Sequence, residues 1–524
     1  MAEGRVTLVR CWDSAILRHA LATTLWVGLG GAARNGCAAL CTSDRVLGVC
    51  EQERVTRVRA AGFNLNGLPD EALDELLRRC GRTRDEVAQY ALGEPAAALD
   101  SDPRVLRLDH HFAHACAAFL TSPFETATIV VCDHQPPEVS VWEGTGGAIT
   151  RVEWPWHGPG FAAVYSQCAQ ALGFAASAQE QRMEALARLE PAPRDARATP
   201  LFDFGTERLL LARNWQARID GWLQAGTAAG GGPQAVAVAA ALQARIGDLL
   251  LEFLAAVRHR NGTTGRLCVA GSLFYNSCFN ARVRSAGLFD QVFVPINPGN
   301  AGLAVGAALH ASGNARRPVT PFLGPSYDPE ETKATLDNCK LNYVWMSEAD
   351  TIAVSVDALR QGRLVGWFDG PMEWGPRALG GRSIVANPFA PHVLENLNRF
   401  LKHRDPWRGY ALSGLEDAVR QHFEGPDTAP FMECDYVPKD RARFRHVLPS
   451  PSAAIRVHSA GGRAPMRFRN LLRAFGEATG VPILVNTSFN GFREPIVCSP
   501  RDAVRVFFGT GLDLLVLGQF VISK

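Results

Sequence analysis

The stretch "LDHHFAHACAAFL", residues 108–120, places three histidines within five positions of an otherwise apolar run. The whole chain of 524 residues has only 13 histidines. Asp109 stands where a helix N-cap would stand, and the helix must end before Pro123. His110 and His114 are four residues apart, so both would face the same side of this helix. We therefore predict a helix that presents two imidazoles to a metal ion.

Two histidines do not complete a metal site, so at least one carboxylate must come from elsewhere. Asp133 lies at the end of "IVVCDH", residues 129–134, which reads as a buried strand. α/β folds place their chemistry at the carboxyl ends of such strands, although an aspartate there is also an ordinary turn residue. His111 points to a different side of the helix from His110 and His114. It is either a proton acceptor, a phosphate-binding group or a structural histidine, and the residues leave these roles open.

Strands and helices alternate along the chain, which predicts a mixed α/β architecture. Short apolar runs bounded by glycine indicate strands at 25–30, 36–42 and 45–54, and helical spacing indicates helices at 69–81 and 233–260. No internal repeat is visible in the sequence. A stretch rich in proline and glycine, "RRPVTPFLGPSYDPEE", lies at 316–331. We expect this stretch to mark the boundary between a domain at 1–325 and a domain at 326–524.

The composition is that of a globular protein with an extensive core, since 47% of the residues are hydrophobic and 20% are charged. The 54 basic and 52 acidic side chains nearly cancel, so no strong field for nucleic acid or anionic membrane is expected. The 13 cysteines are scattered and are expected to be reduced thiols. Arg5, Arg10, Asp13 and Arg18 interrupt any apolar run near the N-terminus, and no segment is long enough to span a bilayer. We expect a cytoplasmic protein.

The second half is rich in positively charged and amide side chains. These occur in "GWFDGPMEWGPRALGGRSIVANP" (366–388), "LKHRDPWRGYA" (401–411) and "VPILVNTSFNGFREPIVCSPRDAVRVF" (481–507). Arginine forks and a lysine can hold two phosphorylated anions together against their mutual repulsion. The candidates for this catalytic role are Arg377, Arg382, Lys402 and Arg404. The candidates for binding phosphate, ribose or an amide are Ser383, Asn486, Ser488 and Asn490, with Arg456 and Arg493 as further candidates.

The pair "DHHFAHACAAF" and "IVVCDH", together with the three motifs of the second half, resembles the nodulation and antibiotic O-carbamoyltransferase family. "LCVAGSLFYNSCFNARV" (267–283) and "PINPGNAGLAVGAALHA" (295–311) are also similar to loops of that family. The resemblance implies an actin-like, ASKHA-type N-terminal domain with two lobes. It further implies a YrdC-like α/β domain at the C-terminus.

The resemblance also implies a reaction in two steps. Carbamoyl phosphate and ATP, with Mg²⁺, would give carbamoyl-adenylate and pyrophosphate in the C-terminal domain. The carbamoyl group would then pass to a hydroxyl of a sugar or natural product at a metal site in the N-terminal domain. The implied ligands of one divalent ion, expected to be Fe²⁺, are His110, His114, Asp133 and Asn300. Gly271 and Asn276 are expected in a nucleotide-binding loop, and His111 among the catalytic residues.

Several positions depart from the family pattern, all in the N-terminal domain. Arg34 and Asn35 stand where the family has a histidine and an aspartate, and Asn300 replaces a carboxylate. His134 replaces a glycine, and Arg182 replaces a lysine. These changes leave a second hypothesis open, in which the N-terminal domain is a non-catalytic scaffold that acts with an intact homologue. Threonylcarbamoylation of tRNA is disfavoured because the charge balance offers no footprint for tRNA. The sequence does not specify the acceptor or the oligomeric state.

Overall fold

The computed structural model describes residues 24–94, 99, 101–174, 179–190, 196–223, 231–261, 264–313, 316 and 319–524. The N-terminal arginines on which the expectation about an export signal rested lie outside these residues, as do two residues of the expected domain boundary. In the described part of the chain, no helix combines the length and the apolar character needed to cross a bilayer.

The first third of the chain forms a five-stranded sheet in the order β3–β2–β1–β4–β5. Its strands are β1 (Leu25–Gly30), β2 (Cys37–Cys41), β3 (Val46–Glu51), β4 (Val87–Leu92) and β5 (Val105–Arg107). β1, β2 and β3 are antiparallel neighbours, whereas β4 and β5 run parallel to β1. Helices α2 (Gln52–Thr56) and α3 (Asp70–Arg79) and the short 3₁₀ turn η1 (Arg84–Glu86) lie between β3 and β4. The predicted third strand is therefore shorter than expected, because α2 begins at Gln52.

A second five-stranded sheet has the order β12–β11–β6–β7–β8. Its strands are β6 (Thr126–Cys132), β7 (Val139–Thr145), β8 (Ala148–Val152), β11 (Arg266–Ala270) and β12 (Gln291–Phe293). β6, β7 and β8 are antiparallel neighbours, and β11 and β12 run parallel to β6. The strand order and directions are the same as in the first sheet. The fold thus contains two topologically equivalent lobes, which the sequence did not reveal because the lobes share no visible sequence repeat.

Two helices join these lobes, α4 (His110–Leu120) and α10 (Asn300–Ala311). α10 packs against both α4 and β1, and this packing requires small residues. A Cβ on Gly306 would lie 2.4 Å from the backbone oxygen of Ala113 in α4, and a Cβ on Gly28 would overlap Ala304 of α10. The run rich in glycine and alanine at 300–311 is therefore explained by the close approach of backbones. The two lobes agree with the expected two-lobed domain, while its actin-like assignment stays a prediction.

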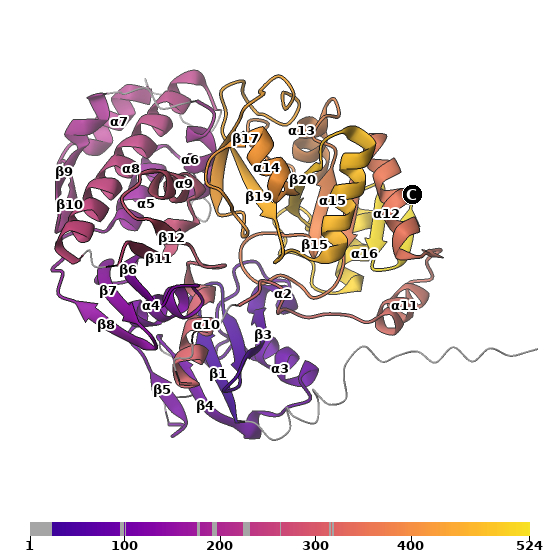
Figure 1. Cartoon of the computed structure of the whole chain (residues 1–524), viewed down its shortest axis with the longest axis horizontal. Coiled ribbons are helices and arrows are strands. Elements are labelled where there is room, and N and C mark those ends of the chain that lie inside the picture. Colours follow the sequence, from indigo (N-terminus) through magenta and orange to yellow (C-terminus); the bar gives the residue numbers. More distant parts are fainter. Residues whose placement is uncertain are drawn as a thin grey trace, which may run out of the picture.

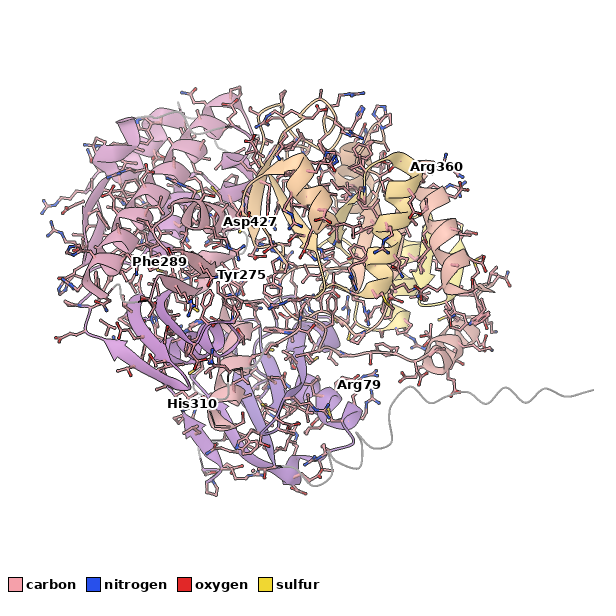
Figure 2. The ribbon with its side chains drawn as sticks, in the orientation of Figure 1. Arg79, Tyr275, Phe289, His310, Arg360 and Asp427 are labelled. Carbon is pink, nitrogen blue, oxygen red and sulfur yellow. The ribbon has the colours of Figure 1, made fainter. Side chains whose placement is uncertain are left out.

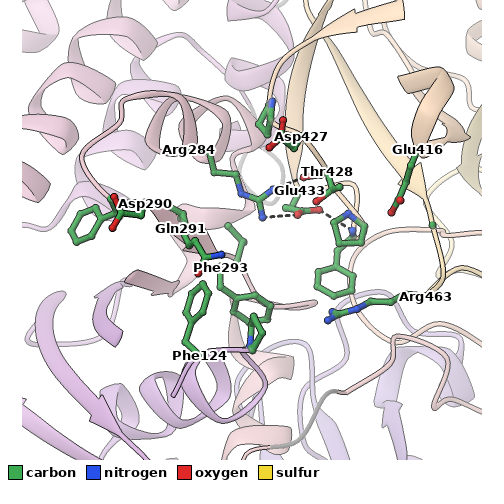
Figure 3. A pocket seen from close by; sticks show the side chains of 18 of the residues that line it. Phe124, Arg284, Asp290, Gln291, Phe293, Glu416, Asp427, Thr428, Glu433 and Arg463 are labelled. Carbon is green, nitrogen blue, oxygen red and sulfur yellow. Dashed lines mark hydrogen bonds and ion pairs between the residues drawn. The ribbon is translucent and has the colours of Figure 1, made fainter. Parts of the chain in front are cut away.

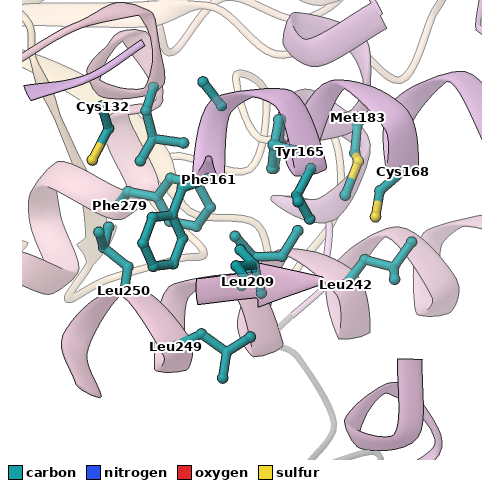
Figure 4. Packing of buried hydrophobic residues seen from close by; sticks show 14 of the residues in the cluster. Cys132, Phe161, Tyr165, Cys168, Met183, Leu209, Leu242, Leu249, Leu250 and Phe279 are labelled. Carbon is teal, nitrogen blue, oxygen red and sulfur yellow. The ribbon is translucent and has the colours of Figure 1, made fainter. Parts of the chain in front are cut away.

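The second lobe encloses the largest helical core of the chain (Figure 4). Its helices are α5 (Phe161–Ala171), α6 (Gln179–Ala187), α7 (Trp215–Leu223), α8 (Pro233–Asn261) and α9 (Ser277–Ser285). The short elements are η3 (Ala196–Leu201), η5 (Ser272–Tyr275) and the hairpin β9 (Phe202–Gly205) and β10 (Arg208–Leu211). α8, predicted at 233–260, buries Leu242, Leu249 and Phe253 completely. Burial of each such side chain stabilises the folded state by about 1.5–3 kcal/mol.

The C-terminal part is built on one ten-stranded mixed sheet in the order β13–β22–β21–β14–β15–β20–β16–β19–β18–β17. Its strands are β13 (Val344–Trp345), β14 (Val365–Phe368), β15 (Arg382–Ala386), β16 (Ala411–Leu415), β17 (Phe423–Glu424), β18 (Cys434–Pro438), β19 (Ile455–Ala460), β20 (Ile483–Ser488), β21 (Leu514–Leu517) and β22 (Phe520–Ser523). This sheet agrees with an α/β domain, and the YrdC-like assignment stays a prediction, as do the domain bounds.

Helices cover both faces of this sheet. α12 (Glu348–Arg360) and α15 (Met466–Thr479) share one apolar cluster on it. The other cluster includes side chains of α11 (Pro329–Asn338), α13 (Val393–Glu395), the π-helical turn η6 (Asn396–Leu401), α14 (Glu416–His422) and α16 (Pro500–Gly509). Ser499 caps α16, and Gly480 ends α15 with φ of 82°. Figure 1 shows this part, coloured orange to yellow, beside the two indigo-to-magenta lobes.

Candidate functional site

Two imidazoles and one carboxylate meet at the carboxyl end of β6. His110 and His114 lie one turn apart on α4, where Asp109 caps the helix by accepting a hydrogen bond from the backbone N–H of Phe112 at 2.8 Å. Oδ2 of Asp133 lies 3.1 Å from Nε2 of His110 and 3.7 Å from Nε2 of His114. One ligand atom from each of the three residues lies within 4.8 Å of the other two. The fold thus brings together the three residues predicted to hold a metal ion.

The polar atoms of this cluster suit a metal ion. His114 is completely buried, and among the residues that the structure describes neither of its ring nitrogens has a hydrogen-bond partner. Leaving a buried polar atom unpaired costs about 1–3 kcal/mol, so a cation at this point would remove a penalty. Burial alone would raise the pKa of the Asp133 carboxyl, but the hydrogen bond from His110 and the nearby imidazole of His114 hold it well below its usual value. Two imidazoles and a carboxylate match iron or zinc better than magnesium.

His111 faces away from this cluster. Its Nε2 donates to the backbone oxygen of Gln135 at 2.9 Å, so its Nδ1 accepts from the hydroxyl of Ser140 at 2.7 Å. That hydroxyl in turn accepts from the indole N–H of Trp142 at 2.8 Å. Burial lowers the pKa of His111 to about 4. Both nitrogens of this neutral ring are hydrogen-bonded within the protein, which favours the structural role among the three alternatives for His111. Its catalytic role stays a prediction.

The remaining predicted residues of the N-terminal lobes lie around this cluster without joining it. Asn300 begins α10, and within the part of the chain that the structure describes its side chain makes no hydrogen bond to His110, His114 or Asp133. Arg34 is exposed in the loop after β1. Asn35, in the same loop, has a left-handed φ of 60°. The role of Asn300 as a fourth metal ligand stays a prediction. Arg34 cannot act as the base of the family pattern, because a guanidinium stays protonated.

The loop between β11 and α9 connects the histidine cluster to the C-terminal part of the chain. The backbone N–H of Ser272 donates to Oδ1 of Asp133 at 2.9 Å. Gly271 has φ of 96°, and a Cβ there would overlap the backbone of Cys132, so the two strand ends can approach only with glycine. Three residues after Ser272, the backbone oxygen of Tyr275 accepts from Nη2 of Arg377 at 3.0 Å. Figure 2 labels Tyr275 near the centre of the molecule.

Asn276 has a structural use in this loop. Its side-chain oxygen caps α9 by accepting from the N–H groups of Cys278 and Phe279, at 3.1 and 3.2 Å. It also exchanges hydrogen bonds of 3.2 Å with the amide of Gln243. The predicted contact of Asn276 with a nucleotide would therefore compete with a helix cap.

Arg377 lies in a region of excess positive charge. Burial first, and then the charge of Arg456, lower the pKa of Arg377 to about 9, against the opposing influence of Glu184. Burial and Arg404 likewise lower the pKa of Arg408 to about 9. Among the described residues, Arg377, Arg404 and Arg408 have no ion-pair partner, whereas buried charges are normally paired. Such a region favours anionic ligands.

Next to Arg377, an ionic network joins the second lobe to the C-terminal sheet. Arg188 of the loop after α6 contacts Glu184 at 2.6 Å and Asp435 of β18 at 2.7 Å. The hydroxyl of Ser277 lies 2.7 Å from both carboxylates and accepts from Nε of Arg456 at 3.1 Å. Sequence reasoning found only Arg456 in this group. The i, i+4 spacing of Glu184 and Arg188 was the one available signal for the others.

Lys402 and two predicted polar residues form a second cluster. Its Nζ donates to the backbone oxygens of Ser488 and Asn490, at 2.6 and 2.9 Å, and to Oδ1 of Asn490 at 2.6 Å. Burial and the neighbouring Arg404 hold the pKa of Lys402 well below its usual value. Arg404 itself bonds Asn398 at 3.0 Å and lies 3.9 Å from the centre of the Tyr410 ring. Three residues predicted to bind substrate anions thus lie together, and their role in binding stays a prediction.

Arg382 does not share this region with Arg377. It is completely buried, and its guanidinium donates to backbone oxygens of Asp369, Gly370, Gly381 and Pro325 at 3.0–3.2 Å. It also lies 3.6 Å from the centre of the Phe368 ring. The expectation that Arg382 reaches an anion beside Arg377 is therefore not met, because β15 turns the side chain into the protein interior.

Three further candidates differ in accessibility. Ser383 is buried and accepts from the N–H of Gly380 at 3.0 Å. Asn486 is buried and donates to the backbone oxygen of Ala378 at 3.0 Å, but its own side-chain oxygen has no partner. Arg493 is exposed, with φ of 57°, and stacks over Phe492 at 5.0 Å. Of the three, only Asn486 offers an unused buried acceptor near the Arg377 loop.

Two cavities flank these groups. A small cavity of about 40 Å³ lies along the connecting loop, and its lining includes His134, Glu184, Ser272, Tyr275 and Asn276. A larger cavity of about 620 Å³ lies between the second lobe and the C-terminal sheet, lined among others by Phe124, Arg284, Glu433 and Arg463 (Figure 3). None of the predicted site residues lines the larger cavity.

Known proteins similar to this chain identify its family. The carbamoyltransferase N-terminus model matches residues 86–309, and the carbamoyltransferase C-terminus model matches residues 356–524. The nodulation protein NolO of Bradyrhizobium diazoefficiens is 31% identical over 446 residues, which cover 80% of this chain and 79% of that protein. An uncharacterised protein of Synechocystis is 30% identical over 490 residues, covering 84% of this chain and 79% of that protein.

Among solved structures, the activator of 2-hydroxyisocaproyl-CoA dehydratase from Clostridium difficile matches 56% of this chain and 95% of its own, at 14% identity and a TM-score of 0.36. This similarity is too low to support an argument about the fold or the function. The sequence matches alone are sufficient for the family, since they extend over both halves of the chain. The chain belongs to the carbamoyltransferase family.

Proposed function

We propose that this protein is an ATP-dependent O-carbamoyltransferase that acts on a hydroxyl of a sugar or natural product. Its substrates are carbamoyl phosphate and ATP with Mg²⁺, and its intermediate is carbamoyl-adenylate. The observation that carries the proposal is the group of Arg377, Arg404 and Arg408, three arginines that form no ion pair with a carboxylate among the described residues. Burial lowers the pKa of each, and the charge of Arg404 lowers that of Arg408 further. Such a group is stabilised by binding anions, and both substrates are anions.

In the first step, water hydrolyses carbamoyl phosphate to carbamate and inorganic phosphate. A carbamate oxygen then attacks the α-phosphorus of ATP, and pyrophosphate leaves. Arg377 and Arg408 offset the repulsion between the two anions, since neither forms an ion pair with a carboxylate in the described part of the chain. Lys402 neutralises a phosphate after exchanging its contact with Asn490 for the ligand. Preorganised donors of this kind each contribute roughly 10²–10³ in rate.

In the second step, the oxygen of the acceptor hydroxyl attacks the carbamoyl carbon, and AMP leaves. A divalent ion held by His110, His114 and Asp133 would polarise the carbamoyl carbonyl. The residues of the chain orient the reactants: Ser272 fixes the Asp133 carboxylate, and the same loop carries the Tyr275 oxygen that holds Arg377. This one loop therefore couples the positions of the two sites, and the family membership supports the overall reaction.

The alternative is that only the C-terminal part is chemically competent and the lobes serve as a scaffold for an intact homologue. The neutral amide of Asn300, where the family pattern has a carboxylate, favours this alternative. Pure protein incubated with ATP and carbamoyl phosphate distinguishes the two, with pyrophosphate and bound metal measured together. Pyrophosphate with stoichiometric metal supports the transferase. Pyrophosphate without bound metal supports the scaffold hypothesis. If neither pyrophosphate nor bound metal is found, both hypotheses are contradicted.

A further inference from the structure

Glu94 is a buried carboxylate that lies beside the histidine cluster without belonging to it. It follows β4, and its Oε2 accepts hydrogen bonds from the backbone N–H groups of Gly31 and Ala32, at 2.5 and 2.8 Å. Its Oε1 lies 4.0 Å from Nδ1 of His110. The side chains of Glu94 and His110 are only 9% and 11% exposed. One oxygen is therefore anchored to the loop after β1, while the other is turned toward an imidazole.

The two nitrogens of His110 face two different carboxylates. Nε2 lies 3.1 Å from Oδ2 of Asp133, on the side of the histidine cluster, and Nδ1 lies on the side of Glu94. The group of ligand atoms that lie within 4.8 Å of one another contains His110, His114 and Asp133 and excludes Glu94. Glu94 is thus too far from His114 and Asp133 to share a metal ion with them. It lies on the Nδ1 side of the His110 imidazole, away from the other ligands.

This position has a chemical consequence for a metal-bound imidazole. Such a ring has one coordinating nitrogen and one N–H, and the group that accepts from the N–H fixes the tautomer and the ring orientation. When Nε2 of His110 faces the cation, Nδ1 must carry the proton. Oε1 of Glu94 is the oxygen that faces this proton, and a shift of about 1 Å would bring the two atoms to hydrogen-bond distance.

We infer that Glu94 is a positioning residue, which holds Nδ1–H of His110 so that Nε2 is presented to a divalent cation. The inference rests on the proposed metal site and deepens it. Glu94 also brings a second negative charge near the cation, at a site where Asn300 offers only a neutral amide. Acceptors in this position typically change metal affinity by about 10- to 100-fold.

Titration of the metal-free protein with Co²⁺, in competition with a chromogenic chelator, tests this inference. For Glu94→Gln, the dissociation constant for Co²⁺ is expected to rise about 10- to 100-fold, with a changed visible spectrum of the bound Co²⁺. The glutamine oxygen can still accept from Gly31 and Ala32, so the fold is retained. Glu143→Gln is the matched control, because Glu143 is exposed on β7 and should leave the affinity unchanged.

The tautomer of His110 gives a second measurement, on the unmutated protein. ¹⁵N-histidine NMR of the Zn²⁺-bound protein is expected to show His110 protonated at Nδ1. Protonation at Nε2 instead, or equal Co²⁺ affinity in Glu94→Gln and the unmutated protein, overturns the inference and leaves the metal site standing. Failure of the unmutated protein to bind either ion overturns the metal site as well.

Discussion

The backbone oxygen of Tyr275 accepts a hydrogen bond from Arg377 at 3.0 Å, across the boundary between the second lobe and the C-terminal sheet. Tyr275 belongs to the same short loop as Ser272, which holds Oδ1 of Asp133 at 2.9 Å. Two groups that the sequence separates by 244 positions, Asp133 and Arg377, are thus joined through four residues. This relationship predicts distinct effects of mutations at its two ends.

At the C-terminal end, replacing Arg377 removes a positive charge that has no carboxylate partner. Arg377→Ala is expected to lower the rate of pyrophosphate formation from ATP and carbamoyl phosphate by roughly 10²–10³. Arg377→Lys should retain part of the rate, because it keeps the charge but loses the planar fork. Arg360→Ala, on the surface helix α12, is the control and should behave like the unmutated protein. A normal rate in Arg377→Ala would contradict the role given to Arg377.

At the other end, His114→Ala removes a completely buried imidazole whose nitrogens accept or donate no hydrogen bond within the described residues. The variant is expected to lose bound divalent metal, measured by elemental analysis after dialysis, and to keep pyrophosphate formation. His111→Gln serves as the comparison, since His111 bonds Ser140 and Gln135 rather than the cluster. If His111→Gln loses metal to the same extent as His114→Ala, the placement of the metal ligands is wrong.

The ionic network between the second lobe and the C-terminal sheet predicts an effect on stability. Glu184→Gln leaves the buried guanidinium of Arg188 with only Asp435 as a carboxylate partner. Removing one partner of a buried ion pair lowers the free energy of unfolding by about 3–5 kcal/mol. Urea denaturation would measure this change. Asp203→Asn breaks the exposed pair with Arg208 and should cost less than about 1 kcal/mol. Equal effects of the two variants would show that the network contributes no stability.

The buried imidazole of His458 should make the stability of the protein depend on pH. Burial lowers its pKa to about 3 in the folded protein, whereas an unfolded histidine titrates near pH 6.5. The unfolded state therefore binds the proton first, and the free energy of unfolding decreases as the pH falls from about 6.5 toward 3. Between about pH 7 and pH 4.5, the free energy of unfolding of His458→Gln should decrease by about 2–3 kcal/mol less than that of the unmutated protein. His392→Gln, at an exposed position, should retain the full pH dependence.

The sequence predicted elements whose signals are local. The helix of α4 follows from Asp109 as its cap and from the turn before Pro123, and the approach of Asp133 follows from its place at a strand end. In both cases the signal lies within a few residues of the position that it predicts. Lys402, Ser488 and Asn490 were named together only through the family resemblance, and their contacts are found in the structure.

Features that depend on long-range pairing could not be predicted in this way. The duplicated sheet topology leaves no trace in the sequence, since equivalent strands need only similar apolar patterns. The orientation of Arg382 depends on which side of β15 faces the interior, and an isolated motif does not specify this. Two partners of Ser277, Asp435 and Arg456, come from β18 and β19, more than 150 residues away in the chain.

The central claim is a division of labour between Arg377 and His114, and one measurement tests it directly. Each variant is incubated with ATP and carbamoyl phosphate without an acceptor, and carbamoyl-adenylate is quantified by mass spectrometry. The account predicts that His114→Ala forms the adenylate as the unmutated protein does, while Arg377→Ala forms almost none. Equal loss of the adenylate in both variants, or its formation in Arg377→Ala, would contradict the account.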